Sequence, residues 1–149
     1  MLTKFLIPMK TTQKIITLIV TTVFTMVFMM SSTSLAQAKA KPWPVPDKDK
    51  AVKATVKLTD ASVIANGKEL WAKHCKSCHG SKGLGDGPKS TSLKTHPGDF
   101  SSAAFQASTD GELFFRTDKG RDDMPAYEKK IPEASDRWSL VAYIRTLKK

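Results

Sequence analysis

Helix signals occur in three stretches of the chain, at about 60–75, 109–120 and 133–148. In the first stretch apolar residues recur with a period near 3.6, which places them on one face of a helix. Between the first two stretches lie a glycine-rich segment, 80–88, and a polar segment, 89–107, whose composition predicts loops. The pattern therefore predicts an all-α fold of about three main helices joined by long loops.

The ends of these helices carry their own signals. Asp60 or Ser62 can cap the first helix, which runs directly into Cys75. The segment Thr109-Asp110-Gly111-Glu112 has the sequence of a capping box and predicts a short helix that stops at Gly120. The last helix ends in two lysines, which suit the negative end of a helix dipole.

Gly67 lies on the apolar stripe of the first predicted helix. A glycine inside a helix costs about 1 kcal/mol relative to alanine, a cost that is expected where another helix passes very close. The last helix carries Leu140 and Tyr143 three residues apart, so both can pack over Gly67 and beside Trp71. We therefore expect the first and last helices to cross at Gly67.

The first 38 residues have the pattern of an export signal. Three lysines and no acidic residue precede the apolar run Ile15–Met30, and Ala36-Gln37-Ala38 provides a small-x-small cleavage site. We expect cleavage after Ala38 and a periplasmic location. An uncleaved segment would instead anchor the protein in a membrane.

Residues 39–59 are predicted to form a flexible tail or linker. Pro42, Pro44 and Pro46 surround Trp43, and the segment has too few apolar residues to bury and too many prolines to be helical. The remaining residues, 60–149, are enough for one domain.

Charge narrows the range of partners. The whole chain has a formal net charge of +10, and loss of the signal would leave 21 basic and 14 acidic residues, or +7. Nucleic acid is not expected as a partner of an exported protein. A redox partner with an acidic patch, an anionic membrane surface, and a basic surface without a specific role all remain open.

The segment Cys75-Lys76-Ser77-Cys78-His79 carries the most specific chemistry. Each thiol can add to one vinyl group of a haem while the adjacent imidazole reaches the iron. A thioredoxin-like redox pair, a zinc site that includes His74, and a plain disulfide are the alternatives. The helix before the motif, the glycine-rich loop after it and the trailing histidine favour one covalent haem.

Met124 is the only methionine after residue 30. Its neighbours are polar and loop-like, so a role in filling a core is not favoured. A thioether is a good sixth ligand for haem iron, and Pro125 beside it stiffens the loop. His96 is the alternative sixth ligand.

Several segments in this order resemble those of the class I c-type cytochromes, close to the small bacterial monohaem type. The resemblance covers about residues 61–149 and rests on the motif from Cys75 to Gly80, Gly87-Pro88, Gly120, Met124-Pro125 and the segment 138–145. The tail and the loop 97–100 depart from the compact mitochondrial form.

This resemblance implies a small all-α fold wrapped round one haem c. Cys75 and Cys78 would carry the thioethers, His79 and Met124 would ligate the iron, and the Pro88 carbonyl would orient the His79 ring. The implied function is one-electron transfer in the periplasm by a monomer that is not an enzyme and has no small-molecule substrate. The alternatives are a haem subunit of a larger oxidase or dehydrogenase, and a haem enzyme or gas sensor if Met124 is displaced from the iron.

Overall fold

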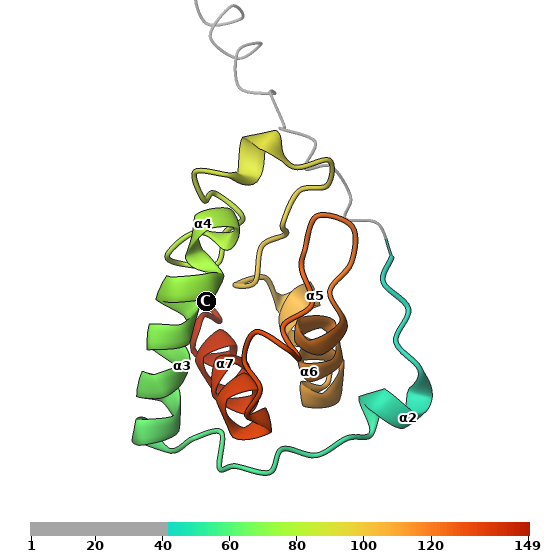
Figure 1. The fold of residues 1–149 in the computed structure, drawn as a ribbon, viewed down its shortest axis with the longest axis vertical. Helices are drawn as coiled ribbons and strands as arrows, with labels where there is room; N and C mark the ends of the chain where they lie inside the picture. The colour runs from blue at the N-terminus through green and yellow to red at the C-terminus, as the bar shows by residue number, and fades with distance from the viewer. Residues whose placement is uncertain (1–41) are drawn as a thin grey trace, which may run out of the picture. The chain divides into compact units, whose positions relative to one another are not determined.

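The computed structural model describes residues 42–149, and in this part of the chain every regular element is a helix (Figure 1). In chain order these elements are α2 (Asp47–Lys50), α3 (Ala61–His74), α4 (Lys76–His79), the 3-10 helix η1 (Ser90–Ser92), α5 (Ala103–Gln106), α6 (Asp110–Lys119) and α7 (Ala134–Thr146). Within these residues extended pairing is limited to an isolated bridge between Arg121 and Met124. The prediction of an all-α fold is confirmed.

The predicted export signal and its cleavage after Ala38 lie outside the described residues. Residues 39–41 of the predicted tail do so as well. In the described part, residues 42–149, no helix combines the length and the apolar character that a membrane span requires.

The three main helices begin where the sequence predicts. The Asp60 carboxylate accepts hydrogen bonds from the backbone N–H groups of Ser62, at 2.8 Å, and Val63, at 3.4 Å, and so caps α3. Thr109 and Glu112 form both halves of the predicted capping box at the start of α6. The last helix, α7, is slightly shorter at each end than the predicted 133–148.

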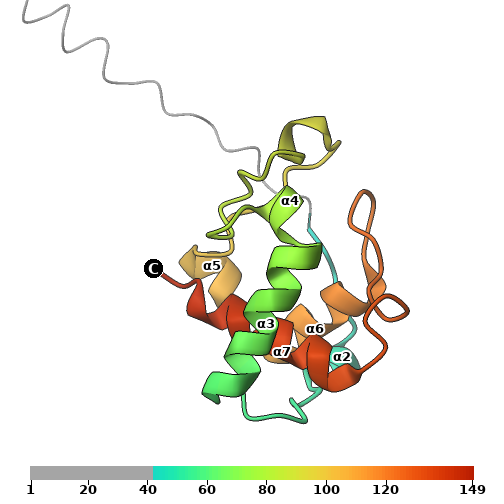
Figure 2. The same ribbon diagram turned by 60° about the vertical axis from the view of Figure 1, so that its left-hand side comes forward.

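Helices α3 and α7 cross with their backbones in contact (Figures 1 and 2). A Cβ atom added at Gly67 would overlap the carbonyl oxygen of Ser139 and lie 3.0 Å from the Cβ of Tyr143. The Tyr143 ring also lies 5.7 Å from the Trp71 ring, measured between centroids. The predicted crossing at Gly67 is confirmed, with the Ser139 backbone as its nearest contact.

Aromatic and aliphatic side chains from α3, α6, α7 and the loops form the hydrophobic core. Its buried members are Trp71, Phe100, Leu113, Tyr127, Ile131, Trp138, Leu140, Val141 and Ile144. Burial of such side chains is the main source of stability in a small domain. The core therefore fixes α3 and α6 against α7, which is the most buried helix of the three.

A buried ion pair connects α6 to α7. Arg137 Nε donates to Asp118 Oδ1 at 2.6 Å, and both side chains are largely buried. Arg137 Nη1 also donates to the carbonyl oxygens of Ile131 and Pro132. The buried guanidinium is therefore paired with one carboxylate and two backbone carbonyls, and these bonds connect the start of α7 to α6 and to the loop before α7.

Two segments that the sequence predicts to be irregular contain short helices. Residues 47–50 form α2, so the prediction that the prolines of 39–59 prevent a helix is wrong at these residues. Their charges support the turn, since Lys50 pairs with Asp47 at 2.8 Å. The predicted loop 89–107 likewise contains η1 and α5.

Gly67→Val tests the crossing of α3 and α7. The new side chain would overlap backbone atoms, which have no rotamer to yield, so we expect a loss of unfolding free energy above the roughly 1–3 kcal/mol typical of overpacking. The midpoint of denaturant unfolding measures this loss. Ala65→Val, at an exposed position of the same helix, is the matched control. Equal midpoints for the two variants would contradict the crossing.

Candidate functional site

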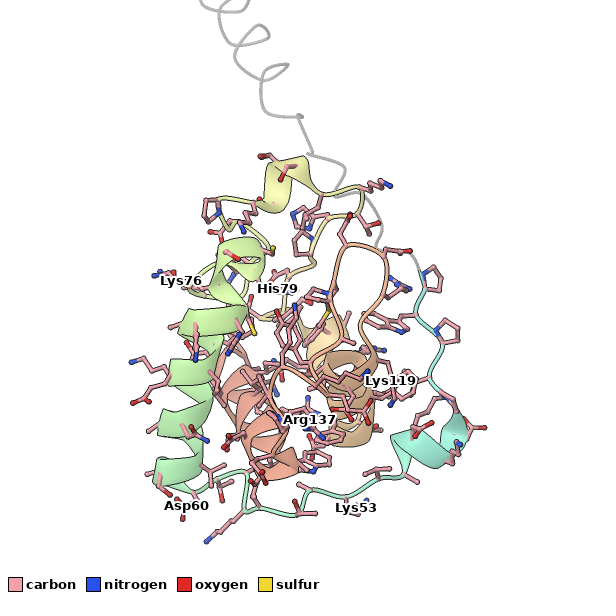
Figure 3. The ribbon with its side chains drawn as sticks, viewed as in Figure 1. Lys53, Asp60, Lys76, His79, Lys119 and Arg137 are labelled. Carbon is pink, nitrogen blue, oxygen red and sulfur yellow. The ribbon has the colours of Figure 1, made fainter. Side chains whose placement is uncertain are left out.

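The two cysteines and His79 lie at the junction of α3 and α4. Cys75 ends α3, with its N–H donating to the Trp71 carbonyl at 2.9 Å. The N–H groups of Cys78 and His79 donate to the Cys75 carbonyl at 3.2 and 3.0 Å, which closes a helical turn. Figure 3 shows His79 on the inner side of α4 and Lys76 on its outer side. One turn therefore presents both thiols and one imidazole.

The environment of the thiols bears on the alternatives to haem. Both cysteines are free and partly buried. Burial, with a smaller contribution from Cys78, raises the pKa of the Cys75 thiol to about 12. A redox-active or metal-bound cysteine needs a thiolate, which this environment opposes. Among residues 42–149, no group of three or more His, Cys, Asp and Glu side chains is placed to hold a metal ion.

His79 is a partly buried, neutral imidazole. Burial lowers its pKa to about 4, so it is uncharged at pH 7, the form in which histidine binds a metal. Its ring centroid lies 4.5 Å from that of Phe100 and 5.7 Å from that of Trp71. The backbone of Pro97 favours the protonated form to a small extent, but Nδ1 has no hydrogen bond of normal geometry.

A cavity of about 360 Å³ brings the predicted site residues together. Cys75, Cys78 and His79 line it from the α3–α4 junction, and Met124 lines it from the loop after α6. Most of the remaining wall is apolar and aromatic, including Trp71, Phe100, Phe105, Leu113, Leu140 and Ile144. An apolar cavity with a few polar groups suits a large, flat, mostly apolar cofactor.

Two buried polar side-chain atoms in the described residues lack a hydrogen-bond partner, and both belong to residues of this cavity wall. They are His79 Nδ1 and Arg116 Nε. Unpaired buried donors and acceptors are costly, so they indicate a missing partner. A haem would fit both the apolar wall and the unpaired cationic group, because it carries negative carboxylates on an otherwise apolar ring.

Met124 is held by a tight turn. Its N–H and C=O are both hydrogen bonded to the backbone of Arg121, each at 2.8 Å. Within the turn Asp122 has a φ of 51°, and the Asp123 carboxylate accepts from the N–H of Lys94 at 2.7 Å. The backbone around Met124 is therefore held by two hydrogen bonds within the turn and by one from Lys94.

Gly120 allows the end of α6 to lie in close contact with the backbone of residues 124–126. It has a φ of 60° and a ψ of 176°, a region that is essentially confined to glycine. A Cβ atom there would lie 2.5 Å from the Pro125 carbonyl carbon and the Ala126 nitrogen, and would overlap the Met124 carbonyl oxygen. The spacing from Gly120 to Met124-Pro125 thus has a steric basis.

Tyr127, which sequence reasoning did not single out, fastens the chain after Met124. Its N–H donates to the Thr117 carbonyl at 3.1 Å, and its hydroxyl donates to the His74 carbonyl at 2.8 Å. Burial raises the pKa of this phenol to about 12, so it remains a donor at neutral pH. Tyr127 links the Met124 loop to the end of α3, and no local sequence pattern indicates such a contact.

Of the two remaining predicted residues, Pro88 and His96, only His96 lies in the cavity wall. Pro88 is exposed and does not line the cavity, although Lys89 N–H bonds to the Ser77 carbonyl at 2.8 Å beside it. No hydrogen bond between His79 and Pro88 is seen, so the orienting role of Pro88 stays a prediction. His96 does line the cavity, with its Nδ1 accepting from the Gly98 N–H at 3.0 Å, and it stays the alternative sixth ligand.

A family model described as cytochrome c matches residues 64–148, which is more than half of the chain. No curated protein sequence matches the chain. Similar solved structures include a chain of a Kuenenia stuttgartiensis reducing HAO-like protein complex, with a TM-score of 0.59 and 24% identity over 74% of this chain. This chain covers 53% of that one, about half of its length. A c-type cytochrome, KustC0563, has a TM-score of 0.45 and 30% identity over 56% of this chain and 98% of its own.

Gly120→Ala tests the steric basis of the Met124 turn. We expect a loss of at least about 1–3 kcal/mol from the backbone conformation alone, and a further loss from the overlap with the 124–126 backbone. Gly98→Ala is the matched control, because Gly98 also has a positive φ, of 85°, but an added Cβ would meet nothing within 4 Å. Denaturant midpoints compare the two. Equal losses would mean that the close approach contributes nothing.

Proposed function

The chain belongs to the cytochrome c family, and we propose that it is a one-electron carrier of the class I type, exported to the periplasm. The family carries covalent haem c, and Cys75 and Cys78 have the spacing for its attachment. We further propose that His79 and Met124 ligate the iron. The observation that carries this proposal is the single cavity lined by both cysteines, His79 and Met124, residues that lie up to 49 positions apart.

When bound, the haem supplies an iron that changes between its ferrous and ferric states. His79 offers a neutral nitrogen, because its burial keeps the ring unprotonated well below neutral pH. Met124 offers a neutral sulfur from a turn that is fixed by two backbone hydrogen bonds. Two neutral protein ligands would leave the iron no open position, which favours electron transfer over chemistry on a bound substrate.

The rest of the wall supports the same role. Apolar and aromatic side chains make up most of the wall, and such a wall limits the rearrangement of solvent when an electron arrives or leaves. Arg116 holds a positive charge at the wall, with Nη1 bonded to Ser108 at 3.0 Å and Nη2 3.7 Å from Glu112. Its unpaired Nε suits a carboxylate of the haem.

The partners follow from charge. The formal excess of seven positive charges after residue 38 favours a protein partner with an acidic docking patch, or a partner at an anionic membrane surface. A haem subunit of a larger oxidase or dehydrogenase is the second candidate. The likeness to a chain of the reducing HAO-like protein complex concerns the fold alone. Co-purification from the native source is the experiment that distinguishes a free carrier from a subunit of a complex.

Replacing both cysteines tests covalent attachment. In Cys75→Ala/Cys78→Ala no thioether can form, so acid acetone should extract all haem from any holoprotein that remains. Wild type should keep its haem under the same treatment, and each single variant should keep it through the remaining thioether. Haem that resists extraction from the double variant would contradict the assignment of these cysteines.

Met124→Ala tests the ligand opposite His79. Ferric wild type should show the weak near-infrared charge-transfer band of methionine-bound iron, and the variant should lack it. The reduction potential should fall by on the order of 0.1 V, within the span of about 0.8 V that axial ligands set. Reduced Met124→Ala should bind carbon monoxide promptly, whereas wild type should not.

Two further variants make this result specific. Met124→His should lower the potential while the iron stays closed to carbon monoxide. His96→Ala should keep the near-infrared band, since His96 is the alternative ligand in the same cavity. A wild type that lacks the band, together with a Met124→Ala variant of unchanged potential and ligand binding, would mean that the sixth ligand lies elsewhere.

A further inference from the structure

A segment that precedes the family match contacts the turn that carries Met124. Trp43 lines the cavity, and the guanidinium carbon of Arg121 lies 4.5 Å from the centroid of its ring. Arg121 Nη1 also donates to the Pro42 carbonyl oxygen at 2.7 Å. One side chain of the turn thus makes a cation–π contact and a charged hydrogen bond to residues 42–43.

Arg121 is the residue best placed to pass this contact on to Met124. Its backbone N–H and C=O are the two groups that bond to the backbone of Met124, at 2.8 Å each. A displacement of the Arg121 side chain and backbone therefore acts directly on the position of Met124. The path from Trp43 to Met124 passes through a single residue.

The segment that carries Trp43 is itself anchored to the domain. Val45 is buried, with 6% of its surface exposed, and the Lys50 carbonyl accepts from Thr109 Oγ1 at 3.0 Å. At Gly111, in α6, an added Cβ would lie 2.8 Å from the Lys50 carbonyl oxygen, so the two backbones are in close contact. Residues 42–50 are a fixed support for Arg121 rather than a free tail.

The turn needs such support for two reasons. Asp122 holds a φ of 51°, which is unfavourable for a residue with a side chain and persists only where surrounding contacts impose it. Met124 is only partly buried and lies outside the buried hydrophobic core, so core packing does not hold it. Contacts from other segments must fix the turn, and Trp43 and Pro42 provide one set of them.

We propose that Trp43 is a positioning residue for Met124, which it holds against the iron through Arg121. This inference rests on the proposed ligation by Met124. Trp43 would slow the departure of the thioether from the iron, and so reduce the rate at which an external ligand replaces it. The residues before the family match would then influence how firmly Met124 binds the iron.

Imidazole binding to the ferric holoprotein tests this role, because imidazole binds only after the methionine has left. We expect Trp43→Ala to bind imidazole about tenfold faster than wild type and to weaken the near-infrared methionine band. Trp43→Phe keeps a ring under the guanidinium and should stay close to wild type. Trp43→Leu keeps an apolar cover without a ring and should resemble Trp43→Ala. Val52→Ala, at an exposed position two residues after this segment, is the control for a nearby change that does not involve Arg121.

A double variant shows whether the effect passes through Arg121. Arg121→Gln should reproduce the faster binding, and adding Trp43→Ala to it should cause little further change, because the two residues act as one unit. Additive effects, or a Trp43→Leu variant that behaves as wild type, would overturn the proposal and leave Trp43 as apolar cover only.

The outcome separates this inference from the proposed function. If wild type shows the methionine band and Trp43→Ala binds imidazole at the wild-type rate, the positioning role is wrong while ligation by Met124 stands. If wild type lacks the band, ligation by Met124 is wrong, and the role of Trp43 is wrong with it.

Discussion

The backbone contact between α3 and α7 at Gly67 sets the geometry on which the site depends. Because the Ser139 carbonyl lies where a Cβ would be, the two helices have one relative position, and the core packs around it. The same α3 ends at Cys75, so the direction of this helix decides where both thiols and His79 lie. Trp71 connects the crossing to the cysteine turn, since its ring packs on Tyr143 of α7 and its Nε1 donates to the Gly80 carbonyl at 3.0 Å.

The wall that carries Met124 is built in a different way. No long helix directs this residue, and its position results from a glycine-only backbone conformation, a two-bond turn and contacts from distant segments. Lys94 and Pro42 each form a hydrogen bond with the segment around it, and Tyr127, three residues after Met124, bonds outward to the His74 carbonyl. The site thus combines one wall on a helix with another that contacts between several loops hold in place.

Local sequence patterns predicted the parts of this structure that are determined locally. The spacing of Cys75, Cys78 and His79 places them on one turn, and the capping box at Thr109 marks the start of α6, because both depend on residues three or four apart. Gly67 was informative because a glycine on an apolar stripe weakens its helix unless another backbone packs closely against it. The sequence also placed Met124 at the site, through its uniqueness after residue 30 and its polar surroundings.

Contacts between distant segments could not be predicted in this way. The contact of Tyr127 and the pairing of Trp43 with Arg121 depend on the paths of loops, which have no periodic pattern. Arg116 lies in α6 and reaches the cavity wall only through the packing of that helix. The helix α2 was missed because one exposed ion pair within four residues is a weak local signal, and the rest of its support comes from α6, some sixty positions away. The orienting role of the Pro88 carbonyl stays a prediction, since a motif gives residue types and their spacing but not the path of the loop that carries them.

The unpaired Nε of Arg116 has a consequence for the protein before its haem arrives. A chain that folded alone would have to leave this cationic donor buried without a partner beside a largely apolar cavity, which favours open forms over the closed one. Open forms are the ones that proteases cut. We therefore expect cellular abundance to follow the supply of haem and the speed of its attachment more closely than the rate of synthesis, so that unloaded chains are removed before they can compete for redox partners.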